Sequence, residues 1–183
     1  NSISFTLNNL LTWGQSQMRE ATTDPTNVDL NALVENNINL LSELAFTKMI
    51  TMDNLIVNKA IIWSDENQMD IVIRNLLSNA LKFTPNNGHI TIGYVDRPDY
   101  LEVFVKDNGI GMDEYVQEQI LSKNTNITTY GTNNEKGTGL GLSLCSEMVI
   151  KNGGTLWVKS EINEGSTFYF TVPKGKKQFQ KSA

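Results

Sequence analysis

Hydrophobic positions recur along this chain with two different periods, one typical of helices and one typical of strands. Apolar residues three or four positions apart predict helices at about 33–49, 66–83, 112–121 and 138–151. Short apolar or alternating runs predict strands at about 55–57, 60–63, 89–95, 101–105, 155–160 and 168–172. Helices interleaved with strands in this way predict an α/β fold, a two-layer α/β sandwich.

A helical apolar stripe at residues 2–20 precedes this pattern and needs a partner surface. The polar stretch 22–27 then interrupts any helix, because Pro25 has no backbone donor and disfavours a helical residue before it. This is the clearest boundary in the chain. We expect an N-terminal helix at 1–20, a linker at 21–27, one folded domain at 28–175 and a C-terminal tail at 176–183.

Length, charge and cysteine content narrow the function classes. A chain of 183 residues can hold one well-buried domain and an appendage, because single domains cluster at roughly 100–150 residues. A net charge of −5 argues against a nucleic-acid surface. The single Cys145 excludes an internal disulfide, and we predict that it is a buried small residue. No apolar run approaches the roughly 18–20 residues of a membrane span.

Four segments carry candidate chemistry. Three contain glycines, which let backbone N–H groups approach a polyphosphate closely. The fourth is a helical stretch rich in Asn, which can supply a metal ligand and a cation. In chain order they are the Asn-rich stretch 74–85, the two glycine clusters 107–111 and 137–142, and the glycine-bearing segment 165–168. Together they predict a nucleotide site.

In that order and spacing the four segments closely resemble the N, G1, G2 and G3 boxes of the GHKL ATPases. Two of these sequences are similar to those of sensor histidine kinases: Asn79-Ala80-Leu81-Lys82-Phe83-Thr84 and Gly137-Thr138-Gly139-Leu140-Gly141-Leu142. The resemblance runs from about Val28 to Pro173. It implies the GHKL (Bergerat) fold, a mixed and mostly antiparallel sheet with helices on one face. It also implies ATP and Mg²⁺ as the nucleotide and metal.

Polar side chains gather on one side of the helix predicted at 66–83. At about 100° per residue, Asn75, Asn79 and Lys82 fall within an arc of roughly 60°, opposite an apolar face. An ordinary solvated helix face is the alternative interpretation. The resemblance implies that Asn79 is the Mg²⁺ ligand, Asn75 a supporting polar contact, Lys82 a phosphate contact and Phe83 a neighbour of the adenine.

The first glycine cluster begins with Asp107, whose carboxylate can accept a hydrogen bond from the amino group of adenine. A simple Asp-Asn-Gly turn is the alternative. The resemblance implies that Asp107 sets adenine specificity with the help of a water and of Thr167, and that Gly109 and Gly111 complete the G1 box.

The second glycine cluster opens a helix, and the N–H groups and positive end of a helix form an anion site. The resemblance makes this the phosphate-proximal G2 box, formed by Gly137, Thr138, Gly139, Leu140 and Gly141. It also makes the polar stretch 122–135 an ATP lid. The stretch 112–136 contains no Phe, where histidine kinases usually carry one, and Ile120 and Leu121 are the candidate apolar replacements.

The only histidine, His89, follows an Asn-Asn-Gly turn at a predicted strand start, and no acidic residue adjoins it in the sequence. A phosphoacceptor is expected on a helix with an acidic neighbour, so we expect His89 to have no part in the chemistry. The resemblance therefore implies transfer of the ATP γ-phosphoryl to a histidine on a helix outside this chain, in a homodimeric parent kinase that passes it to a response regulator receiver domain.

The chain starts at Asn1, so we expect a cytoplasmic fragment of a longer bacterial-type kinase. Whether that parent kinase is membrane-bound is left open. Residues 1–20 would be the end of a dimerisation helix. Two alternatives remain at this point: another GHKL enzyme, such as an anti-sigma-factor serine kinase, and a non-catalytic nucleotide-sensing or dimerisation module.

Overall fold

The computed structural model describes residues 23–56, 59–120, 131–133 and 141–176. The helix expected at 1–20 and the tail beyond Lys176 lie outside these residues. The elements follow the chain in this order: β1 (Thr26–Asp29), α2 (Leu30–Thr47), β2 (Thr51–Asn54), β3 (Ile61–Ser64), α3 (Glu66–Phe83), β4 (His89–Asp96), β5 (Tyr100–Asp107), α4 (Glu114–Ile120), α5 (Gly141–Lys151), β6 (Leu156–Glu161) and β7 (Gly165–Pro173).

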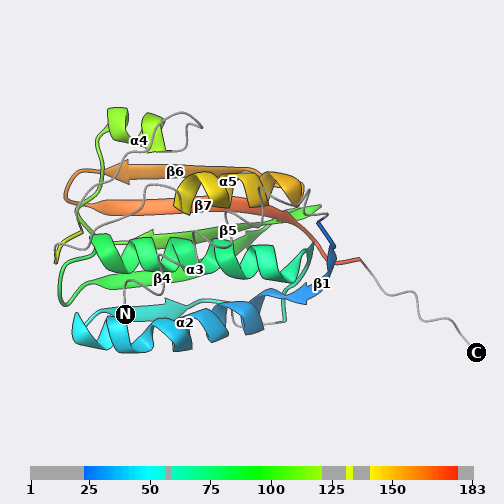
Figure 1. Cartoon of the computed structure of the whole chain (residues 1–183), viewed down its shortest axis with the longest axis horizontal. Helices are drawn as coiled ribbons and strands as arrows, with labels where there is room; N and C mark the ends of the chain where they lie inside the picture. Colours follow the sequence, from blue (N-terminus) through cyan, green and yellow to red (C-terminus); the bar gives the residue numbers. More distant parts are fainter. Residues whose placement is uncertain (1–22, 57–58, 121–130, 134–140, 177–183) are drawn as a thin grey trace, which may run out of the picture.

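A five-stranded sheet with the order β2-β4-β5-β7-β6 forms one layer. The β2–β4 pair is parallel, and the other three pairs are antiparallel. Helices α2, α3 and α5 form the second layer and cover one face of this sheet (Figure 1). The predicted two-layer α/β sandwich, with its mostly antiparallel sheet, is therefore confirmed.

The core lies between these two layers. Side chains of a strand alternate between its faces, and on β5 the alternate residues Leu101, Val103 and Val105 are buried. They meet the buried side of α3, which carries the apolar residues predicted for it: Ile73, Leu76, Leu77, Ala80 and Leu81. The opposite face of the sheet carries the other set of alternating side chains, among them Phe104 and Lys106.

Several strand boundaries differ from the prediction; β7, for example, begins at Gly165 and not at about residue 168. The strand expected at 55–57 lies earlier, as β2, because the Asn54 side chain accepts a hydrogen bond from the backbone of Ile56 at 2.9 Å and turns the chain there. β2 is an edge strand with a polar sequence, so it has little hydrophobic pattern. The first strand, β1, begins at Thr26, inside the predicted linker, and pairs with β3.

Candidate nucleotide site

Helix α3 carries three of the predicted site residues. It begins at the boundary predicted for it because Asp65 caps it, with Oδ1 accepting from the backbone of Gln68 at 3.0 Å. Asn75 is only 5% exposed, whereas Asn79 and Lys82 are half-buried. The polar arc is therefore partly enclosed by the protein, which an ordinary solvated helix face is not.

Asn75 lies against the start of α5. Its Nδ2 donates to the carbonyl of Ile71 at 2.9 Å. A Cβ atom on Gly141, the first residue of α5, would come 3.0 Å from Asn75 Oδ1. Glycine at this position therefore lets the N-terminus of α5 approach the polar arc closely, and the structure brings Asn75 and Gly141 together.

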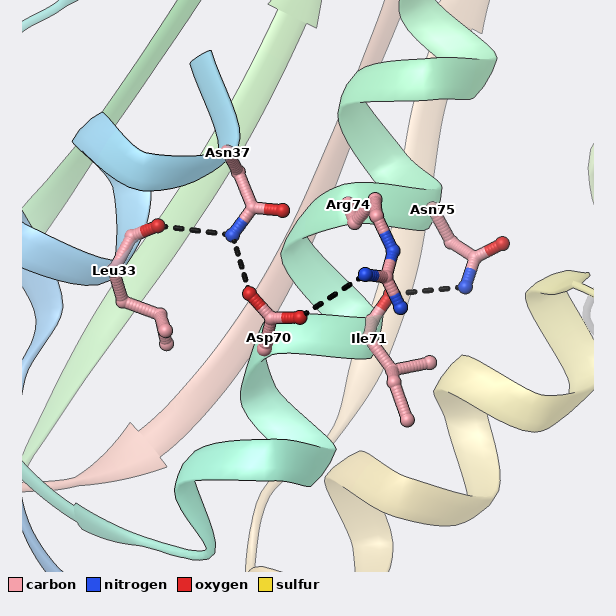
Figure 2. A network of polar contacts seen from close by, with 6 residues as sticks. All are labelled: Leu33, Asn37, Asp70, Ile71, Arg74 and Asn75. Carbon is pink, nitrogen blue, oxygen red and sulfur yellow. Dashed lines mark hydrogen bonds and ion pairs between the residues drawn. The ribbon is translucent and has the colours of Figure 1, made fainter. Parts of the chain in front are cut away.

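A polar network holds the other flank of α3. Figure 2 shows Asp70 on the side of α3 near α2, Asn75 on the side near α5, and the Arg74 side chain between them. Asn37 of α2 donates to Leu33 O at 2.9 Å and to Asp70 Oδ1 at 2.8 Å, and Arg74 pairs with Asp70 Oδ2 at 3.3 Å. These bonds fix the rotation of α3 about its axis, so they also fix where Asn75 and Asn79 point.

Asp107 is the last residue of β5, and it is 4% exposed. Its Oδ1 accepts from the backbone N–H of Gly109 at 2.8 Å and of Ser166 at 3.2 Å. Among the described residues, no group donates a hydrogen bond to Oδ2. Burial raises the pKa of Asp107 above its ordinary value of 3.8, and the hydrogen bonds from Gly109 and Ser166 partly oppose this rise.

The turn after Asp107 packs directly on the end of α3. Ile110 N donates to Phe83 O at 3.1 Å, and a Cβ on Gly109 would come within 2.4 Å of the same oxygen. Gly111 has a φ of +65°, and a Cβ there would come 1.8 Å from Glu161 O. Both glycines are thus required by contacts within the protein. These contacts place the turn after Asp107 against Phe83, whose ring centroid lies 4.5 Å from Lys82 Nζ.

The structure does not bring Thr167 to this site. Thr167 pairs with Lys106 and Lys159, so its side chain lies on the sheet face turned away from the helices. Ser166, the preceding residue, is buried next to Asp107, and its hydroxyl lies 2.9 Å from Ser160 Oγ. The alternation of buried residues along β7, with Phe168 and Phe170 on the helix side, could have identified Ser166 from the sequence.

The remaining predictions concern the second glycine cluster, the proposed ATP lid, its apolar anchors and Cys145. Residues Gly137, Thr138, Gly139 and Leu140 and most of the segment 122–135 lie outside the described residues, as does Leu121. Ile120 packs against the core. Cys145 is buried as predicted, and burial raises its pKa to about 12. This excludes a reactive thiolate at neutral pH.

His89 lies at the start of β4, as predicted. The expectation that it has no acidic neighbour is wrong, because Asp53 Oδ2 of the adjacent strand β2 lies 3.3 Å from His89 Nε2. The two residues are far apart in the sequence, and only the parallel pairing of β2 with β4 brings them together. Both side chains lie on the sheet face away from the helices, since Ile90 and Ile92 fill the core face.

The buried Asp107 beside the end of α3, the asparagine-bearing face of α3 and Gly141 at the start of α5 are the described parts of the predicted nucleotide site. Residues 64–176 match the family model of histidine kinase-, DNA gyrase B- and HSP90-like ATPases. This range is more than half of the chain and includes all the site residues predicted from the sequence. The chain belongs to this family.

Its relatives within the family are sensor kinases. The adaptive-response sensory kinase SasA of Prochlorococcus marinus subsp. pastoris is 34% identical over 158 residues, which are 84% of this chain and 42% of the relative. The catalytic domain of histidine kinase ThkA has a TM-score of 0.70 at 29% identity, over 83% of this chain and 97% of that domain. A complex of ThkA with the response regulator TrrA has a TM-score of 0.71 at 24% identity, over 97% of this chain and 51% of that one.

The fold, the family and these relatives show a histidine kinase ATPase domain. The chain spans about two fifths of the length of the curated relative it matches. Among the described residues, none of the helices has both the length and the apolar character of a membrane span. The same residues hold no group of three His, Cys, Asp or Glu side chains able to bind a metal ion.

Proposed function

We propose that this domain binds ATP and that Asp107 recognises the adenine amino group. The observation that carries the proposal is the asymmetry of the Asp107 carboxylate. Oδ1 is held by two backbone N–H groups, while Oδ2 has no hydrogen-bond donor among the described residues. Oδ2 is not among the fully buried unpaired oxygen atoms of the described residues, so a ligand can reach it and donate a hydrogen bond to it. Adenine presents an amino donor at this edge, and guanine presents a carbonyl there.

We propose further that Asn79 holds the Mg²⁺ ion through its amide oxygen, with Asn75 and Lys82 beside it. Mg²⁺ prefers oxygen ligands and keeps several waters and phosphate oxygens, so one amide from the protein suffices. When bound, it would neutralise charge on the phosphates. The Asn79 side chain makes no hydrogen bond within the described part of the chain, which leaves its oxygen available. Lys82 would contact the phosphates, and Phe83 would line the adenine side.

The N-terminus of α5 would complete the phosphate site. Gly141 sits against Asn75, so the N-terminal end of α5 would face the same region as the polar arc, and a helix N-terminus favours an anion. We include Gly137, Thr138, Gly139 and Leu140 in this proposal on the sequence pattern alone. Gly109 and Gly111 would act indirectly, by setting the position of Asp107.

In the full-length kinase this domain would transfer the γ-phosphoryl of ATP to a histidine other than His89, on a helical dimerisation domain. Positioning and charge neutralisation supply most of the catalysis in such a transfer. We propose a homodimeric kinase and a response regulator receiver domain as the next acceptor. The complex of ThkA with TrrA supports this partner class.

Calorimetry with ATP, ADP and GTP, each with and without Mg²⁺, tests the proposal. We expect ATP and ADP to bind with assistance from Mg²⁺ and GTP to bind much more weakly. Equal affinities for ATP and GTP would contradict the role of Asp107. To test the acceptor, the domain is mixed with a histidine-bearing dimerisation helix or with a serine-bearing antagonist protein. Phosphate on serine instead of histidine would identify a different GHKL kinase.

A further inference from the structure

Lys48, directly after α2, is 1% exposed, although lysine is among the residues least often buried. Its Nζ donates to Leu81 O at 2.7 Å, to Lys82 O at 3.3 Å and to Thr132 Oγ1 at 2.7 Å. An ammonium group has three N–H donors, and these three acceptors are all oxygen atoms of the described residues. The buried charge is thereby solvated by protein oxygen atoms.

Two of these acceptors are carbonyls in the last turn of α3. The last four carbonyls of a helix have no partner within it, and the partial negative charge of the helix end favours a cation there. Lys48 supplies both a donor and a positive charge at this end. The ammonium comes from the end of α2, so it also fixes the end of α2 to the end of α3.

The third acceptor belongs to the segment 131–133. Thr132 is bound to the end of α3 by its backbone as well, since Thr132 N donates to Lys82 O at 3.0 Å. Its hydroxyl lies 3.0 Å from Thr84 O and 3.2 Å from Lys82 O, and it can donate to either while accepting from Lys48. The segment is thus anchored at the residues that carry two proposed ATP contacts, Lys82 and Phe83.

We propose that Lys48 is a positioning residue for ATP binding, because its ammonium fixes Thr132 against the last turn of α3. The role rests on the proposed function of the site. In this role Lys48 does not touch the nucleotide. It sets the backbone from which Lys82 and Phe83 project, and Phe83 O in turn anchors the Asp107 turn through Ile110 N.

The test compares Lys48→Met, which keeps the apolar stem and removes the donors, with Thr132→Val, which removes only the hydroxyl. Asn152→Ala is the matched control. Asn152 is also buried and joins two helices, since it accepts from Asp65 N at 2.7 Å and donates to Met148 O at 2.8 Å, but it lies at the opposite end of α3. Each variant chain is assayed for Mg·ATP affinity, for stability in urea and for exchange of the Thr132 amide.

We expect Lys48→Met and Thr132→Val each to weaken Mg·ATP binding by about tenfold, the equivalent of one hydrogen bond to a charged group. The double variant should lose little more than either single variant, because both remove the same contact. Exchange of the Thr132 amide should accelerate in both. Asn152→Ala should lose stability and keep its affinity within about twofold.

Three results would overturn the proposal. One is unchanged affinity in both Lys48→Met and Thr132→Val. Another is a loss of affinity in Asn152→Ala as large as theirs, because affinity would then only follow stability. The third is full additivity in the double variant. Failure of the unmodified chain to bind Mg·ATP would contradict the proposed function itself. The three results above would contradict only the role of Lys48, so the two failures are distinguishable. Thr132→Val keeps the test decisive if Lys48→Met does not fold.

Discussion

An aspartate lies at each end of α3, Asp65 as its N-cap and Asp107 at the end of the neighbouring strand β5, and the two carboxylates are held in different ways. At the start of the helix, Asp65 accepts from Gln68 N through one oxygen and from Asp24 N through the other. Asn152 closes this end by binding Asp65 N and the side chain of Gln68. At the far end, Asp107 has two donors on one oxygen and, among the described residues, none on the other.

This difference separates a structural carboxylate from one suited to recognition. Asp65 is half-buried, and each of its two oxygens already accepts a hydrogen bond from the chain itself, so a ligand would gain less from it. Burial raises the pKa of Asp107, and its Oδ2 accepts no hydrogen bond from the described residues. The domain therefore carries at one end of α3 a carboxylate oxygen that is available to a nucleotide.

The largest effect is expected from Asn79→Ala, at the same end of the helix as Asp107. Loss of the amide oxygen should reduce the Mg²⁺-dependent part of ATP binding by tenfold to about 100-fold, since even an indirect metal contact contributes this much. Stability should hold, because the side chain is half-buried and outside the core. Asn67→Ala, at an exposed position near the start of α3, is the control and should leave binding unchanged.

Asp107→Asn should have the next largest effect. The amide can still accept from Gly109 and Ser166, but its other end presents an NH₂ group toward the adenine amino group. We expect ATP affinity to fall by about tenfold or more, as for the loss of a hydrogen bond to a charged group. Asp65→Asn should leave the affinity unchanged. Equal losses in the two variants would remove the distinction between the ends of α3.

The same substitution should stabilise the free domain at neutral pH. The pKa of Asp107 is raised in the folded state, so the folded protein holds this proton more tightly than the unfolded one. Its contribution to stability is therefore favourable at low pH and is lost as the pH rises from about 3.8 through the folded pKa. The stability difference between Asp107→Asn and the unmodified chain should grow over that window in urea titrations at several pH values. A difference that does not change with pH would contradict the assigned shift.

A smaller effect should distinguish Ser166 from Thr167. Ser166→Ala and Thr167→Val each remove one hydroxyl, from opposite faces of β7. Since a neutral hydrogen bond contributes about 1 kcal/mol, Ser166→Ala should weaken ATP binding by roughly fivefold. Thr167→Val should change nothing measurable in the same calorimetric titration. A loss confined to Thr167→Val would restore the original assignment from the sequence.

Local patterns explain why much of the fold was predictable. The bounds of α3 match the prediction because a cap, a long apolar period and Pro85 all act within one segment. The burial of Cys145 and the apolar face of α3 follow from the same periodicity. Within the site, the structure supports the polar arc, with Asn75 more enclosed than a solvated face would be.

Long-range contacts explain most of what could not be predicted from the sequence. Lys48 gives no local signal, because a lysine after an amphipathic helix usually lies in solvent, and its acceptors are 33, 34 and 84 residues away. β2 is polar and lies at an edge, so its register depends on β4 and not on its own pattern. The misplacement of Thr167 is different in kind, because the period of two along β7 already places Ser166 on the core side.

The smallest effect is expected from His89→Ala. Asp53 gives His89 an acidic partner, so the absence of such a partner no longer argues against a phosphoacceptor role. The position does, because the His89 side chain projects from the sheet face opposite the helices that form the proposed site. Incubation of the chain with labelled ATP should give no acid-labile, alkali-stable phosphate, and His89→Ala should not alter this. A supplied dimerisation helix should become labelled equally by both forms. Phosphate on this chain that disappears in His89→Ala would show that the exposed sheet face takes part in the transfer.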